Sequence, residues 1–173
     1  MLSTPTIHVA RELRSRISPA LLLELARRAR RAAQYLALEP RLWSTLGLRI
    51  VDDREMAELH LRFMGEEGPT DVLSFAGAEL DPSFELEDSL GDIVIDWQAV
   101  VRQAHGHGSR AWLDEASILF VHGLAHLLGH DHRDRREGRS MFELERRMLR
   151  RLGLPVRPRP YAPKLLPGRE ASA

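Results

Sequence analysis

The segment HGLAHLLGHDH, residues 122–132, constrains the fold of this chain more than any other feature. His122 and His126 are four residues apart, so on an α-helix they project from one face, one turn apart. Two imidazoles in that arrangement can bind a single ion. Gly129 then permits the left-handed turn that ends a helix, and the chain can double back to present His132. The sequence therefore predicts a helix that ends in a tight turn beside its own histidines.

Three imidazoles around one point form the ligand set of a catalytic zinc site. Structural zinc sites close with four protein ligands, whereas catalytic sites keep a fourth position open for water or substrate. We therefore expect one Zn²⁺ per chain, held by His122, His126 and His132, with a zinc-bound water as the reacting group. Zinc can lower the pKa of such a water from about 9 to about 7. His130 faces a different direction, and we expect it to neighbour the site or face the substrate.

The same histidine spacing occurs in the metzincin proteases, which carry a Glu directly after the first His as general base. In this chain that position is Gly123, which has no side chain. The metal-binding pattern is kept, while the base that a peptidase needs is absent. A zinc metallopeptidase is therefore an alternative function that Gly123 disfavours.

Hydrophobic periodicity along the rest of the chain predicts four short strands and about five helices. This mixture indicates an α/β (α+β) fold with one layer of sheet. The expected strands cover residues 6–10, 48–51, 72–76 and 92–97, and the expected helices cover 18–39, 53–64, 97–105, 109–128 and 134–152.

A length of 173 residues favours one domain, which we place at residues 1–152 as a single catalytic domain. Half of the ten prolines follow Gly153, so we expect residues 153–173 to be a flexible, extended tail. The chain contains no cysteine, which excludes a disulfide framework and a cysteine nucleophile and fits a reducing compartment. The N-terminus lacks the apolar core of a signal peptide, and no apolar run approaches the roughly 20 residues of a membrane helix. We therefore expect a cytoplasmic protein with no membrane partner.

The formal net charge of zero conceals a segregation of charge along the chain. Residues 1–51 carry a net +6, residues 52–96 a net −12, and residues 97–173 a net +6. Binding of a polyanion depends on the local field rather than on the total charge. A polyanionic partner is therefore compatible with this neutral chain.

Several segments together resemble the YbeY family, the bacterial single-strand-specific endoribonucleases of ribosomal RNA maturation. HGLAHLLGHDH resembles the family signature, and Pro69–Phe75 resembles its PTDVLSF segment. Residues Gly91–Ile95 resemble its GDIVI strand, and Met141 with Glu145 match its M-x-x-x-E pattern in the last helix. The resemblance covers about residues 45–152.

This resemblance implies a zincin-like fold in which a small mixed sheet packs against helices, with His122, His126 and His132 as the zinc ligands. It implies hydrolytic cleavage of single-stranded RNA in 16S ribosomal RNA 3′-end maturation and in ribosome quality control. The implied partners are ribosomal RNA and the small ribosomal subunit, and no DNA is expected. A ribosome-assembly factor without catalytic activity, in which zinc is structural, is a further alternative.

The resemblance also places Thr70, Asp71 and Ser74 along the substrate cleft, although the same residues could serve only to close a turn and end a strand. The family commonly has Arg six residues before the Thr of PTDVLSF, where this chain has Met64. Arg62 is the nearest cation in sequence, but two residues along a helix point about 200° apart. We retain Arg62 as a candidate substrate-binding residue.

Two acidic residues near the histidines have alternative interpretations. Asp131 could accept a proton during catalysis, or it could only shape the turn from Gly129 to His132, because Asp is a common turn former. Glu115 lies two helical turns before His122, so it could orient a ligand or only favour the start of its helix.

The family often has an aromatic residue where this chain has His130.

The charge pattern gives the RNA hypothesis a further expectation. Arginines of the first helix and of residues 133–151 should form a positive rim around the zinc cleft. The acidic loop at residues 77–91 should lie away from the RNA path.

Overall fold

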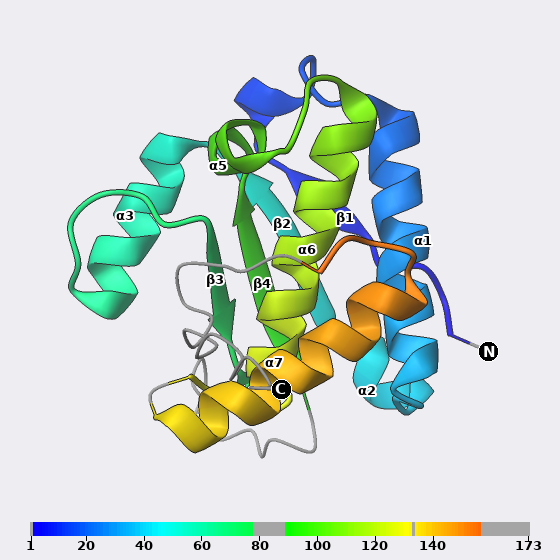
Figure 1. Cartoon of the computed structure of the whole chain (residues 1–173). Coiled ribbons are helices and arrows are strands. Elements are labelled where there is room, and N and C mark those ends of the chain that lie inside the picture. The colour runs from blue at the N-terminus through cyan, green and yellow to red at the C-terminus, as the bar shows by residue number, and fades with distance from the viewer. Residues whose placement is uncertain (1, 78–88, 133, 157–173) are drawn as a thin grey trace, which may run out of the picture.

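A single mixed sheet forms the centre of the protein, which we describe from a computed structural model covering residues 2–77, 89–132 and 134–156. The strands lie in the order β1-β2-β4-β3 (Figure 1). The neighbours β1–β2 and β2–β4 are parallel, whereas β3 runs antiparallel to β4 at the edge of the sheet. The strands are β1 (Ile7–Val9), β2 (Leu46–Val51), β3 (Val72–Phe75) and β4 (Gly91–Asp96).

Six α-helices and one 3-10 turn surround this sheet in the described part of the chain, so the predicted α/β fold with a small mixed sheet is confirmed. The four-residue helix α2 was not predicted, because it is too short to show a helical period. The elements are η1 (Arg11–Leu13), α1 (Pro19–Tyr35), α2 (Pro40–Trp43), α3 (Asp53–Met64), α5 (Trp97–Gln103), α6 (Ser109–Leu127) and α7 (Arg135–Arg151).

Side-chain caps fix where several helices begin. The Ser18 hydroxyl accepts a hydrogen bond from Leu21 N at 3.2 Å, with Pro19 at the first helical position. The Asp134 carboxylate accepts hydrogen bonds from the backbone N–H groups of Arg136 and Glu137. This last cap matters for function, because it starts α7 at Arg135, three residues after His132.

The main core lies between one face of the sheet and α6, which is buried along most of its length. Side chains of β2 and β4 such as Leu48, Ile50, Ile93 and Ile95 form this face. Helices α1 and α7 cover α6 from outside, so α6 is a central helix, and a helix in that position is expected to be apolar on nearly all sides.

The opposite face of the sheet carries a smaller cluster, in which Met56 of α3 packs against Val51, Leu73, Phe75 and Val94. Helix α3 therefore lies beside the β3 edge, whereas α1 lies on the other side of the molecule (Figure 1). The predicted loop at 77–91 and the predicted tail at 153–173 fall mostly outside the described residues. None of the described helices is both long enough and apolar enough to span a membrane.

Candidate metal centre

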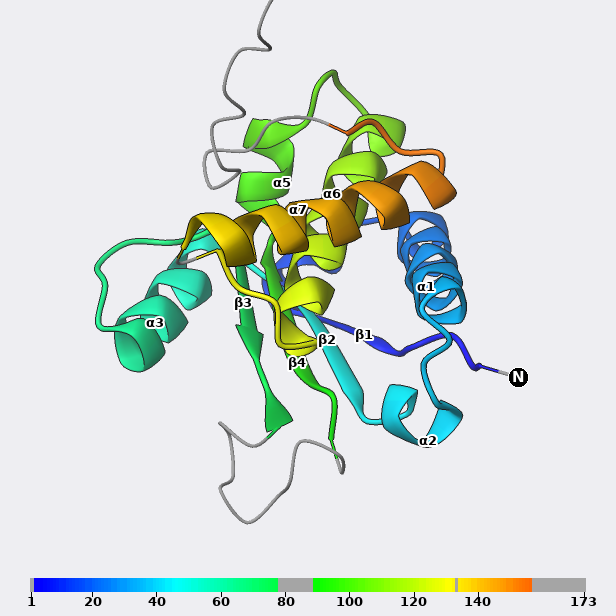
Figure 2. The same ribbon diagram turned by 60° about the horizontal axis from the view of Figure 1, so that its bottom comes forward.

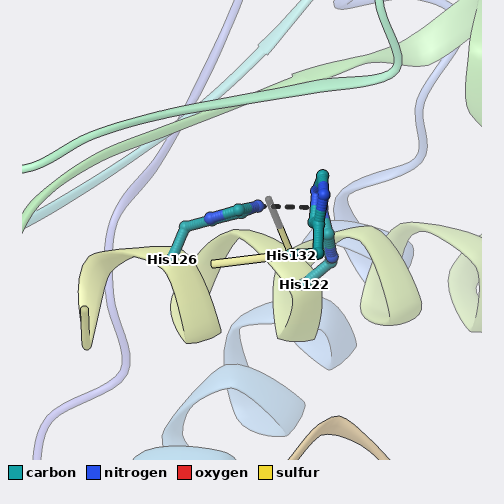
Figure 3. A group of neighbouring side chains, drawn as sticks. All are labelled: His122, His126 and His132. Carbon is teal, nitrogen blue, oxygen red and sulfur yellow. Dashed lines mark hydrogen bonds between the residues drawn. The ribbon is translucent and has the colours of Figure 1, made fainter. Parts of the chain in front are cut away.

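The C-terminal end of α6 brings the three histidines together (Figure 3). His122 and His126 project from the last turns of the helix, one turn apart. Gly129 then adopts a left-handed conformation with φ 81°, and His130 N donates to Ala125 O at 3.1 Å. This pattern ends the helix and reverses the chain direction. The reversal carries His132 back to its two partners, as the sequence predicted.

The distances between the imidazole nitrogens fit a single small cation. His122 Nε2 and His126 Nε2 are 3.2 Å apart, and one nitrogen from each of the three rings lies within 4.8 Å of the others. Two nitrogen ligands at about 2.0–2.1 Å from a tetrahedral Zn²⁺ would be about 3.3 Å apart. The two helical histidines therefore already have the separation that tetrahedral zinc requires.

Exposure changes in steps across the three ligands: His122 is buried, His126 is half-buried and His132 is exposed. The site is consequently closed on the helix side and open toward solvent. Burial and the neighbouring His122 and His132 imidazoles lower the pKa of His126 to about 4. His126 is therefore neutral near pH 7, which is the form that binds a metal.

A carboxylate from α7 contacts His122, the most buried of the three histidines. Glu145 Oε1 lies 2.6 Å from His122 Nδ1, and both side chains are buried. An acceptor at Nδ1 places the ring proton there and leaves Nε2 to face the other histidines, which is a common way of orienting a metal-binding imidazole. The sequence matched Glu145 to a family pattern without giving it this role. Its position on the otherwise apolar stripe of α7, four residues after Met141, was the available signal.

From the sequence, Glu115 could orient a metal ligand, but in the structure it lines a separate small cavity. It is 4% exposed and borders a small cavity with His105 and Ile118, two turns before His122 on α6. The carboxylate hydrogen-bonded to His122 Nδ1 is Glu145.

The histidines open into a cavity of about 580 Å³ between α6 and the β3 edge. Thr70, Asp71 and Ser74 line this cavity from the β3 side, and Met64 lines it from the end of α3. The fold therefore brings together three of the four residues predicted to bind substrate. The fourth, Arg62, is not among the lining residues, and its guanidinium carbon lies 5.2 Å from the centre of the Phe63 ring.

The two aspartates that line the cavity, Asp71 and Asp131, both accept hydrogen bonds. Asp131 Oδ1 accepts a hydrogen bond from His132 N at 2.7 Å, so this residue does shape the turn that carries the third ligand. Asp71 Oδ2 accepts from Gln103 Nε2 at 3.1 Å, and Asp71 O accepts from Asp96 N. The start of β3 is therefore attached to α5, and this fixes one wall of the cavity. His130 also lines the cavity, beside Asp131.

Gly123 lies where α6 approaches the sheet most closely. A Cβ atom at this position would be 2.9 Å from both Ile93 Cγ2 and Ser74 Oγ. Packed interiors do not accommodate such contacts without displacement. A Glu side chain at position 123, as a metzincin-type peptidase requires, does not fit this backbone arrangement.

The arginines of the first helix do not form the predicted rim. Arg27 and Arg31 pair with Glu24, and Arg28 pairs with Asp114 at 2.7 Å. Helix α1 lies on the far side of α6 from β3 (Figure 1), and no described residue lining the cavity is an arginine or a lysine. The expectation failed because sequence alone did not place α1 relative to the cavity.

Comparison with known proteins gives a consistent family match. The family model described as "Endoribonuclease YbeY" matches residues 10–153. A relative named endoribonuclease YbeY from Thermobifida fusca is 43% identical over 129 residues, which cover 72% of this chain and 81% of the relative. A relative of the same name from Acidothermus cellulolyticus is 38% identical over 152 residues, covering 83% and 89%.

A solved structure supports the fold. The solution structure of TM1509 from Thermotoga maritima aligns with a TM-score of 0.51 at 22% identity, covering 85% of this chain and 89% of that protein.

Proposed function

This chain belongs to the YbeY family of endoribonucleases, which are hydrolases that act on RNA. We propose that it is a zinc-dependent enzyme specific for single-stranded RNA. We further propose that it acts in 16S ribosomal RNA 3′-end maturation and ribosome quality control, with the small ribosomal subunit as partner. The observation that carries the proposal is the convergence of three histidines in the lining of a cavity of about 580 Å³.

Three residues would bind the metal, and two others position them. His122, His126 and His132 would bind one Zn²⁺. The 3.2 Å separation of the His122 and His126 Nε2 atoms and the lowered pKa of His126 support this, as does the position of one nitrogen of each ring within 4.8 Å of the others. A zinc ion there would polarise a phosphoryl oxygen and lower the pKa of a coordinated water to near neutrality. Glu145 keeps His122 in the binding orientation, and Asp131 holds the backbone of His132.

The β3 side of the cavity is where we place the RNA. The hydroxyl groups of Thr70 and Ser74 can donate to phosphate oxygens, while Asp71 can accept from a ribose hydroxyl or a base. Asp131 is the cavity carboxylate closest in sequence to the ligands, and we assign it the role of proton acceptor in addition to its turn role. Asp131→Asn keeps an oxygen for the His132 N–H and removes the basic carboxylate, so it separates the two roles.

The organisation of the chain follows from the same proposal. We assign residues 1–152 to one catalytic domain, which is supported by the family match over residues 10–153. The absence of cysteine supports a cytoplasmic site of action. Residues 157–173 of the predicted tail lie outside the described part of the chain.

A substrate panel tests the proposed function. Metal-replete wild-type protein is incubated with single-stranded RNA, double-stranded RNA, single-stranded DNA and an unfolded protein, each with and without chelator. We expect chelator-sensitive cleavage of single-stranded RNA only. Cleavage of the protein substrate would favour the peptidase, and tight zinc binding without any RNA cleavage would favour the assembly-factor alternative.

Met64 allows a second test of how RNA binds in this cavity. Met64 is 49% exposed and lines the cavity wall, at the position where the family commonly has Arg. We expect Met64→Arg to increase RNA cleavage several-fold, because it adds a cation to a cavity whose described lining has none. Met64→Gln, which is polar but uncharged, is the control. Equal activity of both variants and wild type would contradict the role given to this position.

A further inference from the structure

Helix α7 has a basic outer face in addition to the inner face that reaches the metal centre. Its buried residues include Met141, Leu144, Glu145 and Met148. At 3.6 residues per turn, the exposed arginines cluster on the opposite half of the helix, within about 160° of arc. These residues, which we call the α7 arginine face, are Arg135, Arg136, Arg139, Arg147, Arg150 and Arg151.

The α7 arginine face has no ion-pair partner among the residues that the structure describes. None of its six guanidinium groups forms an ion pair with a described residue, whereas Arg146 on the same helix pairs with Glu143 at 2.6 Å. Three of the four α1 arginines differ, since Arg27 and Arg31 share Glu24 and Arg28 pairs with Asp114. In the folded protein, α7 therefore has more arginines without an acidic partner among the described residues than α1 has.

The position of α7 connects this face to the catalytic cavity. The helix begins three residues after His132, and its inner Glu145 contacts His122. Figures 1 and 2 both show α7 crossing over α6, with its first turns on the side of β3 and α3 and its last turns toward α1. A helix of 17 residues is about 25 Å long, so the face leads from the cavity rim across the molecule.

Resting on the proposed function, we infer that the α7 arginine face binds the phosphates of the RNA strand where it leaves the cavity. The described cavity lining has no arginine or lysine, so apart from the proposed Zn²⁺ the cationic groups that attract the rest of a polyanion lie outside the cavity. Arginine is well suited to this role, because its fork of N–H donors matches phosphate oxygens. The cavity would then select and cut the strand, while α7 supplies affinity without reading sequence.

The test compares paired charge removals on the two basic helices. Arg147→Ala/Arg150→Ala removes two charges from the α7 arginine face, and Arg27→Ala/Arg31→Ala removes two from α1. Binding of a fluorescently labelled single-stranded RNA, longer than the cavity can hold, is measured by anisotropy over a salt series. The logarithm of the association constant falls linearly with the logarithm of the salt concentration, and each phosphate contact contributes about 0.7 to the steepness of this fall. We therefore expect the line for the α7 variant to be shallower than that of wild type by about 1.4.

Three controls keep the result interpretable. The α1 variant is expected to retain the wild-type slope, and Arg147→Lys/Arg150→Lys is expected to restore most of the slope lost in the alanine variant. The KM for RNA cleavage should rise more for a long RNA than for an oligonucleotide of a few nucleotides.

Equal slopes for the α7 and α1 variants would overturn the inference while leaving the proposed function intact. Binding to anionic lipid vesicles is measured in parallel. If the α7 variant loses vesicle binding but binds RNA like wild type, the inference is also overturned and the proposed function is unaffected. If wild-type protein neither binds nor cleaves RNA, the proposed function itself fails, and the inference fails with it.

Discussion

At the scale of single residues, the proposed metal centre includes a side chain that is not a predicted ligand. Glu145 lies on α7, 23 residues from His122, yet its carboxylate is only 2.6 Å from the imidazole. A buried carboxylate in this position fixes the ring orientation and makes the imidazole a stronger ligand. The three histidines were predictable from spacing within one helix and its turn. The role of Glu145 was not, because it depends on how two helices cross.

Substitution of Glu145 should weaken metal binding more than it weakens the fold. Glu145→Gln keeps the size of the side chain and an acceptor oxygen but removes the charge beside His122. We expect zinc affinity, measured by competition with a chromophoric chelator, to fall about 10- to 100-fold. Glu143→Gln on the same helix is the control, since Glu143 pairs with Arg146 away from the ligands. Wild-type affinity in Glu145→Gln would show that this hydrogen bond does not support the site.

At the scale of elements, the close fit of α6 against the sheet leaves no room for a side chain at position 123. Gly123 permits a close approach of the helix to Ile93 and Ser74, and this places the histidines beside β3. The sequence predicted the bounds of α3 and most of α6 correctly, because capping residues and helical period mark them. It did not predict the short α2 or the placement of α1, which depend on contacts between distant segments.

The packing at Gly123 predicts a measurable loss of stability. Gly123→Ala introduces a Cβ atom 2.9 Å from Ile93 Cγ2 and Ser74 Oγ. We expect the free energy of unfolding in urea to fall by about 1–3 kcal/mol, although alanine favours helices. Adding Ser74→Gly should recover part of the loss, because it removes one of the two obstructing atoms. Unchanged or increased stability of Gly123→Ala would contradict the proposed steric exclusion of a glutamate here.

The junction of α3, β4 and α5 predicts a pH dependence of stability. Asp96 is fully buried, and burial together with the neighbouring Asp53 raises its pKa from 3.8 to about 7. The Arg102 guanidinium, 2.8 Å from Asp53 Oδ2, lowers the pKa of Asp53. Between about pH 4 and pH 7 the folded protein therefore binds a proton at Asp96 that the unfolded chain has released.

Stability consequently falls as pH rises through this interval, by at most about 1.4 kcal/mol per pH unit from this group. Asp96→Asn retains a helix-capping oxygen and cannot ionise, so we expect its unfolding free energy to decrease less than that of wild type between pH 5 and pH 8. Urea denaturation at both pH values measures the difference. The lowered pKa of Asp53 acts below this range and does not alter the sign. Parallel pH profiles for the two proteins would show that Asp96 is already ionised at pH 5.

At the scale of the whole molecule, the neutral net charge is distributed so that a basic helix lies next to the cavity that the three histidines line. Composition alone did not distinguish the arginines of α1 from those of α7. The fold does, because it pairs three of the four α1 arginines, Arg27, Arg28 and Arg31, with acidic neighbours and leaves the α7 arginine face exposed. The family and the fold class were both predictable from sequence, whereas the surface that we propose for a polyanion could be identified only from the arrangement of helices around α6.

The central claim, a histidine-bound metal that enables RNA cleavage, is tested most directly by one paired measurement. Zinc content and cleavage of single-stranded RNA are determined for wild type and for His126→Ala, before and after chelation and zinc restoration. We predict that wild type binds one zinc per chain and loses and regains cleavage with it, while His126→Ala neither retains zinc nor cleaves RNA. Full zinc content in His126→Ala, or RNA cleavage by wild type that survives complete metal removal, would contradict the account.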